Sequence, residues 1–167
     1  LYDKKELPEK TVIITFDDGY ESNYIYAYPV LKKYGFKGII FIIGDKVVES
    51  KQSSNPNMIP KLTYDEIREM ADSGLVEFGS HTFDAHEMID GKPALLNMSS
   101  EEIYQDFEKI KELFNKLGLP NPRGIAYPFG GFDDKTVKAA EAIGLKLGFT
   151  VKKGFLNQDS PAMTLNR

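Results

Sequence analysis

Two neighbouring carboxylates, two histidines and a rigid turn are the parts of this sequence whose residue types and spacing could do chemistry. Asp17 and Asp18 stand in the stretch TFDDGY, directly after an apolar run. His81 and His86 are the only histidines of the chain and lie in the stretch SHTFDAH. The stretch YPFGG, which contains Phe129, combines a proline with two glycines. One carboxylate with two imidazoles can hold a divalent metal and leave a position open for water.

Each of these signals is weak when it is taken alone. An Asp-Gly pair usually forms a turn, and Pro-Phe-Gly is an ordinary turn sequence. Two histidines in one loop are more often solvated than bound to a metal. Their joint position is what gives them weight, because all three clusters directly follow predicted strands. In parallel α/β folds, sites gather beyond the carboxyl ends of the strands.

If the three clusters meet, their chemistry fits the hydrolysis of an ester or amide. A divalent metal lowers the pKa of its water from about 15.7 towards roughly 7. One of the two aspartates, Asp17 and Asp18, can bind the metal while the other removes a proton from the attacking water. A backbone N–H of the Pro-Phe-Gly turn can stabilise the resulting oxyanion.

The elements that must position these residues alternate between strands and helices. Apolar, β-branched runs predict strands at 11–16, 38–43, 75–80, 123–127 and 145–151. Helices are predicted between them at about 23–34, 64–73, 100–117 and 134–143, with a loop at 44–61. Capping signals for three of these helices are Thr63 with Glu66, Ser99 with Glu102, and Asp133.

This order predicts an α/β fold with a largely parallel sheet and helices outside it. A complete eight-stranded barrel takes about 250 residues. The pattern therefore leaves two possibilities, which are an open doubly wound sheet and an incomplete barrel.

Composition bounds the class of protein. The 167 residues predict one domain, 1–167. The net charge of −4, without a dense run of Lys or Arg, argues against a nucleic-acid partner. No apolar run is long enough to span a membrane. The absence of cysteine excludes disulfides and thiolate zinc sites, and the oligomeric state is left open.

The motifs TFDDG, SHTFDAH and YPFG, in this order and at these strand ends, resemble those of the polysaccharide deacetylase family. This is carbohydrate esterase family four, with its NodB-like homology domain, and the resemblance covers Thr11 to about Gly154. It implies a distorted, incomplete (β/α) barrel with parallel strands. It also implies a metal-dependent hydrolase that removes N-acetyl groups from an amino-sugar polymer outside the bacterial cell or at its surface.

The resemblance further implies a role for each motif residue. Asp17 would be the general base, and the N–H of Phe129 would stabilise the oxyanion. Asp18, His81 and His86 would hold one divalent metal ion, with zinc first and cobalt, nickel or iron as alternatives.

Departures from the family's pattern sharpen these expectations. Many members space their two histidines four residues apart, whereas the spacing of five between His81 and His86 resembles the subgroup acting on poly-β-1,6-N-acetylglucosamine of biofilms. Many members carry an arginine that commonly pairs with the base where Ala126 stands here, which leaves the tuning of Asp17 open. No histidine follows His86, so the family's late general acid is missing. Arg167 stands where relatives often carry an arginine before another strand, so we expect a barrel truncated at its C-terminus.

Three aromatic residues in the same loops could stack on a sugar ring, and loop packing explains them equally well. They are Tyr20, Phe83 and Phe132. The expected partner is a polysaccharide that contains N-acetylglucosamine. Alternatives are peptidoglycan or a chitin oligomer as the substrate, or a non-catalytic glycan-binding module of the same fold. A receiver-like domain, the weakest alternative, leaves both histidines unused.

Overall fold

The computed structural model describes residues 10–51 and 59–167, and strands and helices alternate along them. The strands are β1 Ile14–Phe16, β2 Gly38–Ile42, β3 Val76–Ser80, β4 Met88–Ile89, β5 Lys92–Pro93, β6 Gly124–Ala126 and β7 Leu147–Phe149. The α-helices are α1 Tyr28–Tyr34, α2 Tyr64–Asp72, α3 Ala94–Asn97, α4 Ser100–Leu117 and α5 Asp134–Ala142. Two further helical turns are the π-helix η1 Asn23–Ala27 and the 3₁₀ turn η2 Pro128–Gly130.

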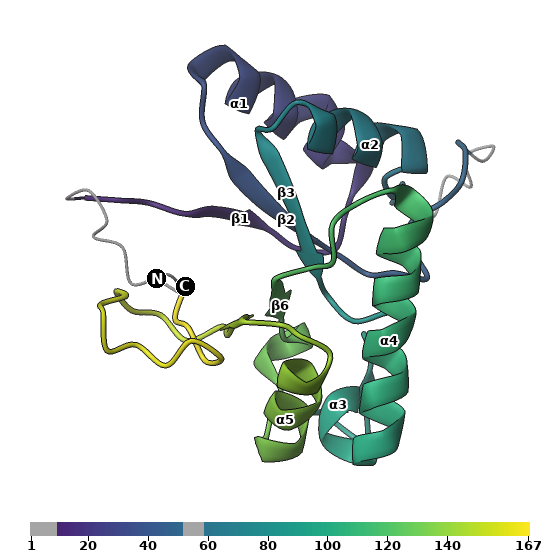
Figure 1. Ribbon diagram of the computed structural model, residues 1–167, viewed down its shortest axis with the longest axis vertical. Helices are drawn as coiled ribbons and strands as arrows, with labels where there is room; N and C mark the ends of the chain where they lie inside the picture. Colours follow the sequence, from purple (N-terminus) through teal and green to yellow (C-terminus); the bar gives the residue numbers. More distant parts are fainter. Residues whose placement is uncertain (1–9, 52–58) are drawn as a thin grey trace.

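Five strands form one parallel sheet in the order β1-β2-β3-β6-β7. The sheet curls, and α1, α2, α4 and α5 lie along its outer side, as Figure 1 shows. The predicted incomplete (β/α) barrel with parallel strands is therefore confirmed. Because all five strands run the same way, their carboxyl ends meet at one rim, where ligands bind in folds of this type.

Helix α4 joins the two main parts of the hydrophobic core. Its N-terminal turns pack Ile103 and Phe107 into one cluster, called here the lower cluster. Its C-terminal turns pack Ile110 and Phe114 into another, called the upper cluster. These residues recur at the spacing of one helix face. Each such side chain contributes about 1.5–3 kcal/mol when it is fully buried. The same buried face also carries a carboxylate, Asp106.

The predicted helix starts are confirmed in detail. Thr63 and Glu66 form a complete capping box before α2, and Ser99 and Glu102 form another before α4. The Asp133 side chain accepts the N–H of the third residue of α5 at 3.0 Å. Local sequence was sufficient here because a cap involves only neighbouring residues.

Two elements differ from the prediction. The strand expected at 11–16 forms only as β1, and Val12 is 81% exposed. The reason is that β1 lies at the edge of the sheet, where β2 is its only neighbouring strand among the described residues. The helix expected at 23–34 is a π-helical turn followed by α1. Pro29, near the start of α1, has no N–H to continue a regular α-helical ladder.

The segment between the predicted strand 75–80 and the predicted helix 100–117 contains further structure, although no element is predicted there. Strands β4 and β5 pair there as a short antiparallel hairpin, and α3 follows. Residues 52–58 of the predicted loop 44–61 lie outside the described residues. Within the described ranges, none of the helices combines the length and hydropathy that crossing a bilayer requires.

Candidate active site

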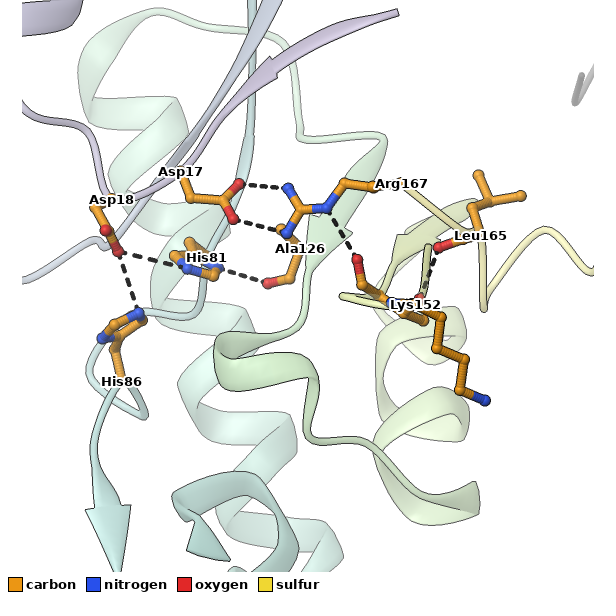
Figure 2. A network of polar contacts seen from close by, with 9 residues as sticks. Asp17, Asp18, His81, His86, Ala126, Lys152, Leu165 and Arg167 are labelled. Carbon is orange, nitrogen blue, oxygen red and sulfur yellow. Dashed lines mark hydrogen bonds and ion pairs between the residues drawn. The ribbon is translucent and has the colours of Figure 1, made fainter. Parts of the chain in front are cut away.

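The three sequence motifs follow β1, β3 and β6 and meet at the carboxyl rim of the sheet. Strands β1 and β3 both pair with β2, and β3 pairs with β6 through Ser80 and Ile125. This arrangement brings residues far apart in the chain into one network of polar contacts, which Figure 2 shows from close by.

Asp18, His81 and His86 converge as a triad of possible metal ligands. Asp18 Oδ1 lies 3.5 Å from His81 Nε2 and 3.2 Å from His86 Nε2. One ligand atom from each residue lies within 4.8 Å of the other two. Asp18 Oδ1 is buried yet has no hydrogen-bond partner within the described part of the chain. A cation between the three atoms would satisfy that oxygen, so the donor set fits a divalent metal.

The backbone carbonyl of Ala126 fixes the tautomer of His81. His81 Nδ1 lies 2.7 Å from Ala126 O, which can only accept, so Nδ1 carries the hydrogen. Nε2 then presents its lone pair towards Asp18. Burial lowers the pKa of His81 below its ordinary value of 6.5, against the opposing effect of its contact with Ala126. His81 is therefore held as the neutral imidazole that a metal ligand needs.

The carboxylate of the triad is held in its charged form. The polar contact with His86 is the largest influence and lowers the pKa of Asp18, while burial opposes it. The positive charges that His81 and Lys61 can carry act in the same direction as His86.

A tight turn aims Asp18 at the two histidines. Asp18 and Gly19 both have left-handed backbones, with φ of 72° and 62°. Such a conformation costs free energy at a residue other than glycine. The turn is tied down from a distant segment, because Lys61 Nζ donates to Asp18 O at 2.9 Å and Leu62 N donates to Gly19 O at 3.0 Å. Lys61 also lies over the Tyr20 ring, 3.7 Å from its centroid.

Asp17 lies beside the triad and pairs with Arg167, the last residue of the sequence. The two terminal nitrogens of Arg167 donate to the two Asp17 carboxylate oxygens, each at 2.7 Å (Figure 2). Arg167 Nε donates to Thr150 O at 2.9 Å, and Arg167 N donates to Lys152 O at 2.9 Å. The guanidinium therefore holds Asp17 in one orientation while leaving it free of the triad.

The Asp17–Arg167 pair also closes the curl of the sheet. Asp17 follows β1 and Arg167 comes after β7, and these are the two edge strands. The segment before Arg167 lies beside β7 through a parallel bridge between Leu165 and Phe149. Residues 150 positions apart meet because the sheet bends far enough to bring its edges together.

The turn that follows β6 brings Phe129 next to the triad. Phe129 has φ of 55° and ψ of 14°, and its ring lies 4.8 Å from the His86 ring. Gly130 N donates to Tyr127 O and Gly131 N donates to Pro128 O, at 2.9 and 3.0 Å. These bonds define a rigid turn, which is the local requirement for a preorganised backbone donor.

Comparison with known proteins identifies the family. Residues 4–148 match the family model described as polysaccharide deacetylase. The chain belongs to this family. A poly-β-1,6-N-acetyl-D-glucosamine N-deacetylase of Staphylococcus epidermidis is 34% identical over 159 residues, which are 95% of this chain and 54% of the relative. The chain spans about half the length of the curated relatives it matches.

Solved structures agree with this assignment. IcaB from Ammonifex degensii superposes with a TM-score of 0.87 at 30% identity, covering 100% of this chain and 70% of that one. The Streptococcus pyogenes deacetylase PplD, solved in complex with acetate, gives a TM-score of 0.81 at 29% identity. That comparison covers 99% of this chain and 67% of PplD.

Within this polysaccharide deacetylase fold, the three predicted sugar-stacking aromatics all have packing partners. The Tyr20 ring lies beneath Lys61, and Phe83 packs against the upper core cluster. Phe132 stacks on Tyr127 with ring centroids 5.0 Å apart and packs against the lower cluster. Their role towards a sugar stays a prediction.

The sequence did not predict the contacts that two residues make at the site. The sequence predicts from Arg167 only that the barrel is truncated. Asp17 lacks its usual arginine at position 126, and that absence could have suggested Arg167 as its partner. Lys61 carried no signal, because its contact with Asp18 crosses 43 positions of the chain.

Proposed function

We propose that this protein is a metal-dependent N-deacetylase of an amino-sugar polymer, with poly-β-1,6-N-acetylglucosamine as its substrate. The convergence of Asp18, His81 and His86, with the Asp17 carboxylate beside them and outside the triad, carries the proposal. The substrate is supported by relatives named for this deacetylation at 34% and 36% identity. The spacing of five between the two histidines supports the same subgroup.

Asp18, His81 and His86 would hold the metal ion, for which zinc is the first choice and cobalt, nickel or iron are alternatives. Bound there, the ion would supply a Lewis acid that polarises the acetyl carbonyl and makes water more acidic. These side chains bind metal as neutral imidazole and ionised carboxylate. The lowered pKa of His81 favours the first form, and the lowered pKa of Asp18 favours the second.

The remaining residues of the site handle the proton and the developing charge. Asp17, whose carboxylate oxygens accept hydrogen bonds from Arg167, would take the proton from the attacking water. Arg167 would keep the carboxylate in the orientation that this transfer needs. The N–H of Phe129, at the rigid turn after β6, would donate to the oxyanion that the acetyl carbonyl oxygen becomes when water adds to the carbonyl carbon. The proton that Asp17 has taken up would then pass to the departing nitrogen, and the C–N bond would break to give acetate and a free amine on the sugar.

Acetate release from defined polymers tests this function. Poly-β-1,6-N-acetylglucosamine, a chitin oligomer and peptidoglycan would each be incubated with the protein after loading with zinc, cobalt or nickel. We expect acetate from the first substrate above the other two. In Asp17→Asn, acetate release should fall to background while the metal stays bound, whereas His81→Ala should lose metal as well as turnover.

The same experiment separates the enzyme from a glycan-binding module. A module would bind the polymer and release no acetate with any of the three metals, and Asp17→Asn would change nothing. Unchanged metal content in both His81→Ala and His86→Ala would refute the ligand assignment. Release from peptidoglycan alone would move the substrate to the cell wall.

The location proposed for the protein is outside the cell or at the bacterial cell surface, because the polymer is found there. Immunodetection in the extracellular and cell-surface fractions of the source bacterium tests this, and detection in the cytosol alone would contradict it.

A further inference from the structure

A buried carboxylate on α4 lies next to the loop that carries the two histidines. Asp106 is only 6% exposed and sits on the helix face that otherwise packs Ile103, Phe107 and Ile110 into the core. A carboxylate in apolar surroundings is costly unless hydrogen bonds compensate it. Its partners therefore indicate what it does.

Within the described ranges, the hydrogen bonds of the Asp106 carboxylate all come from one short segment. Phe83 N donates to Oδ1 at 2.8 Å, Asp84 N donates to Oδ2 at 2.8 Å, and Ala85 N donates to Oδ2 at 3.0 Å. These three residues are consecutive, and His86 follows them directly. The carboxylate thus binds the backbone of the loop between the two histidines without touching either imidazole.

Other contacts also hold that loop, because Asp45 N donates to Phe83 O at 2.9 Å and the side chains of Phe83 and Ala85 pack into the core. Asp106 differs from them in binding three consecutive amides directly before His86.

The loop belongs to no helix or strand, and Thr82 has a left-handed backbone with φ of 70°. His81 is fixed independently, because it directly follows β3 and its ring bonds to Ala126 O. The position of His86 depends instead on how residues 83–85 are folded, and Asp106 bonds to the N–H of each of them.

The charge of Asp106 suits this task better than a neutral side chain would. Two carboxylate oxygens can accept several N–H groups at once, and charge-assisted hydrogen bonds are about twice as strong as neutral ones. Burial raises the pKa of Asp106, while the three N–H groups oppose that shift. A buried charge that costs stability and serves one functional loop suggests more than a packing role.

We propose that Asp106 is a positioning residue for the metal centre. Its carboxylate holds residues 83–85 so that the His86 imidazole faces His81 and Asp18 before any metal binds. This inference rests on the metal role in the proposed function. It adds a residue of α4, which lies outside all three motifs, to the machinery of the site.

Cobalt binding to Asp106→Asn tests the inference. Asparagine keeps the size of the side chain but places an NH₂ group, which cannot accept, against at least one of the N–H donors. We expect the affinity for Co²⁺ to fall by about 10- to 100-fold, the range for residues that orient metal ligands. The visible absorption spectrum of the bound cobalt should also change, since the arrangement of its ligands would differ.

Asp133→Asn is the matched control. It removes the same charge from an aspartate that likewise accepts a backbone N–H, at the start of α5. We expect it to lower the melting temperature without changing cobalt affinity or the spectrum. If Asp106→Asn behaves like this control, with affinity within twofold of the parent protein, Asp106 is only structural and the inference is wrong.

Amide hydrogen exchange on the unsubstituted, metal-free protein keeps the inference testable if Asp106→Asn fails to fold. The amides of Phe83, Asp84 and Ala85 should exchange at least 100-fold more slowly than in an unstructured peptide. Exchange at the unstructured rate would show that the loop is not held before metal binds, which overturns the inference. If the parent protein binds no zinc, cobalt or nickel, the proposed metal site falls and the inference falls with it.

Discussion

Replacing Arg167 with methionine should slow deacetylation while leaving the metal bound. Methionine keeps a long side chain in the same place but removes both hydrogen bonds to Asp17. The Asp17 carboxylate would then be free to rotate or to gain water, so fewer molecules would have it in position to take the proton. The triad should be unaffected, since Arg167 contacts none of its three members.

The size of the effect follows from how deeply the pair is buried. The Arg167 and Asp17 side chains are 21% and 29% exposed, so they lie between the surface and the interior. Exposed ion pairs contribute about 0.2–1 kcal/mol, and breaking a buried pair costs about 3–5 kcal/mol. Hydrogen bonds to charged groups are worth about 1.5–3 kcal/mol. If that loss falls on the transition state, kcat/KM should drop by about 10- to 100-fold.

Steady-state acetate release, metal analysis and urea unfolding together make the assay. Arg167→Lys should recover only part of the rate, because an ammonium keeps the charge but not the fork that bonds to both oxygens. Thr150→Val is the control for the surrounding segment. It removes the hydroxyl that donates to Leu165 O at 3.0 Å and accepts from Lys152 N at 3.1 Å, without touching Asp17.

Two results would refute the reasoning. One is a kcat/KM within threefold of the parent in Arg167→Met, with stability and metal content unchanged. The other is an equal loss of rate in Thr150→Val, because then the effect would come from the C-terminal segment rather than from the carboxylate.

Three further predictions concern the turn, the buried imidazole and the core. In Lys61→Met the bond to Asp18 O is lost, so zinc affinity measured by competition should fall about tenfold; an unchanged affinity would contradict this. Burial lowers the pKa of His81 below 6.5, so the unfolded chain binds a proton at this imidazole more readily than the folded chain does. Urea unfolding of the metal-free protein should therefore show that the free energy of unfolding decreases as the pH falls below about 6.5. A free energy of unfolding that does not change with pH in this range would be evidence against this prediction. Tyr127→Phe removes a buried hydroxyl that donates to Met163 O at 3.0 Å and should lower the free energy of unfolding by about 1 kcal/mol, measured with urea.

The fold could be predicted largely because its signals are local. Apolar runs marked the strands, and Thr63 with Glu66 or Ser99 with Glu102 marked helix starts within four residues of sequence. The motif residues could be placed because parallel strands bring their carboxyl ends to one rim. Local patterns could not show that β1 begins only at Ile14 and leaves out Val12. That depends on which strand lies beside it at the edge of the sheet.

The supporting residues of the site could not be found in this way. Lys61 and Asp106 act on backbone atoms, Asp18 O in one case and the amides of residues 83–85 in the other. Any residue type can offer those atoms, so they leave no pattern in the sequence. Only the folded geometry identifies these contacts, although a carboxylate at Asp106, on the otherwise apolar face of α4, is unusual in itself.

The arginine that pairs with Asp17 shows why a missing motif residue need not mean a missing function. Ala126 is fully buried in one core cluster with Phe41 and Phe149, so an arginine side chain at this position would have to displace the core. The backbone of Ala126 is nevertheless used, because its carbonyl orients His81. The guanidinium reaches Asp17 from Arg167 instead, across the closing edge of the curled sheet. The same charge at the same carboxylate can therefore be supplied from β6 or from the segment after β7, and its origin is decided by which position has room for the arginine.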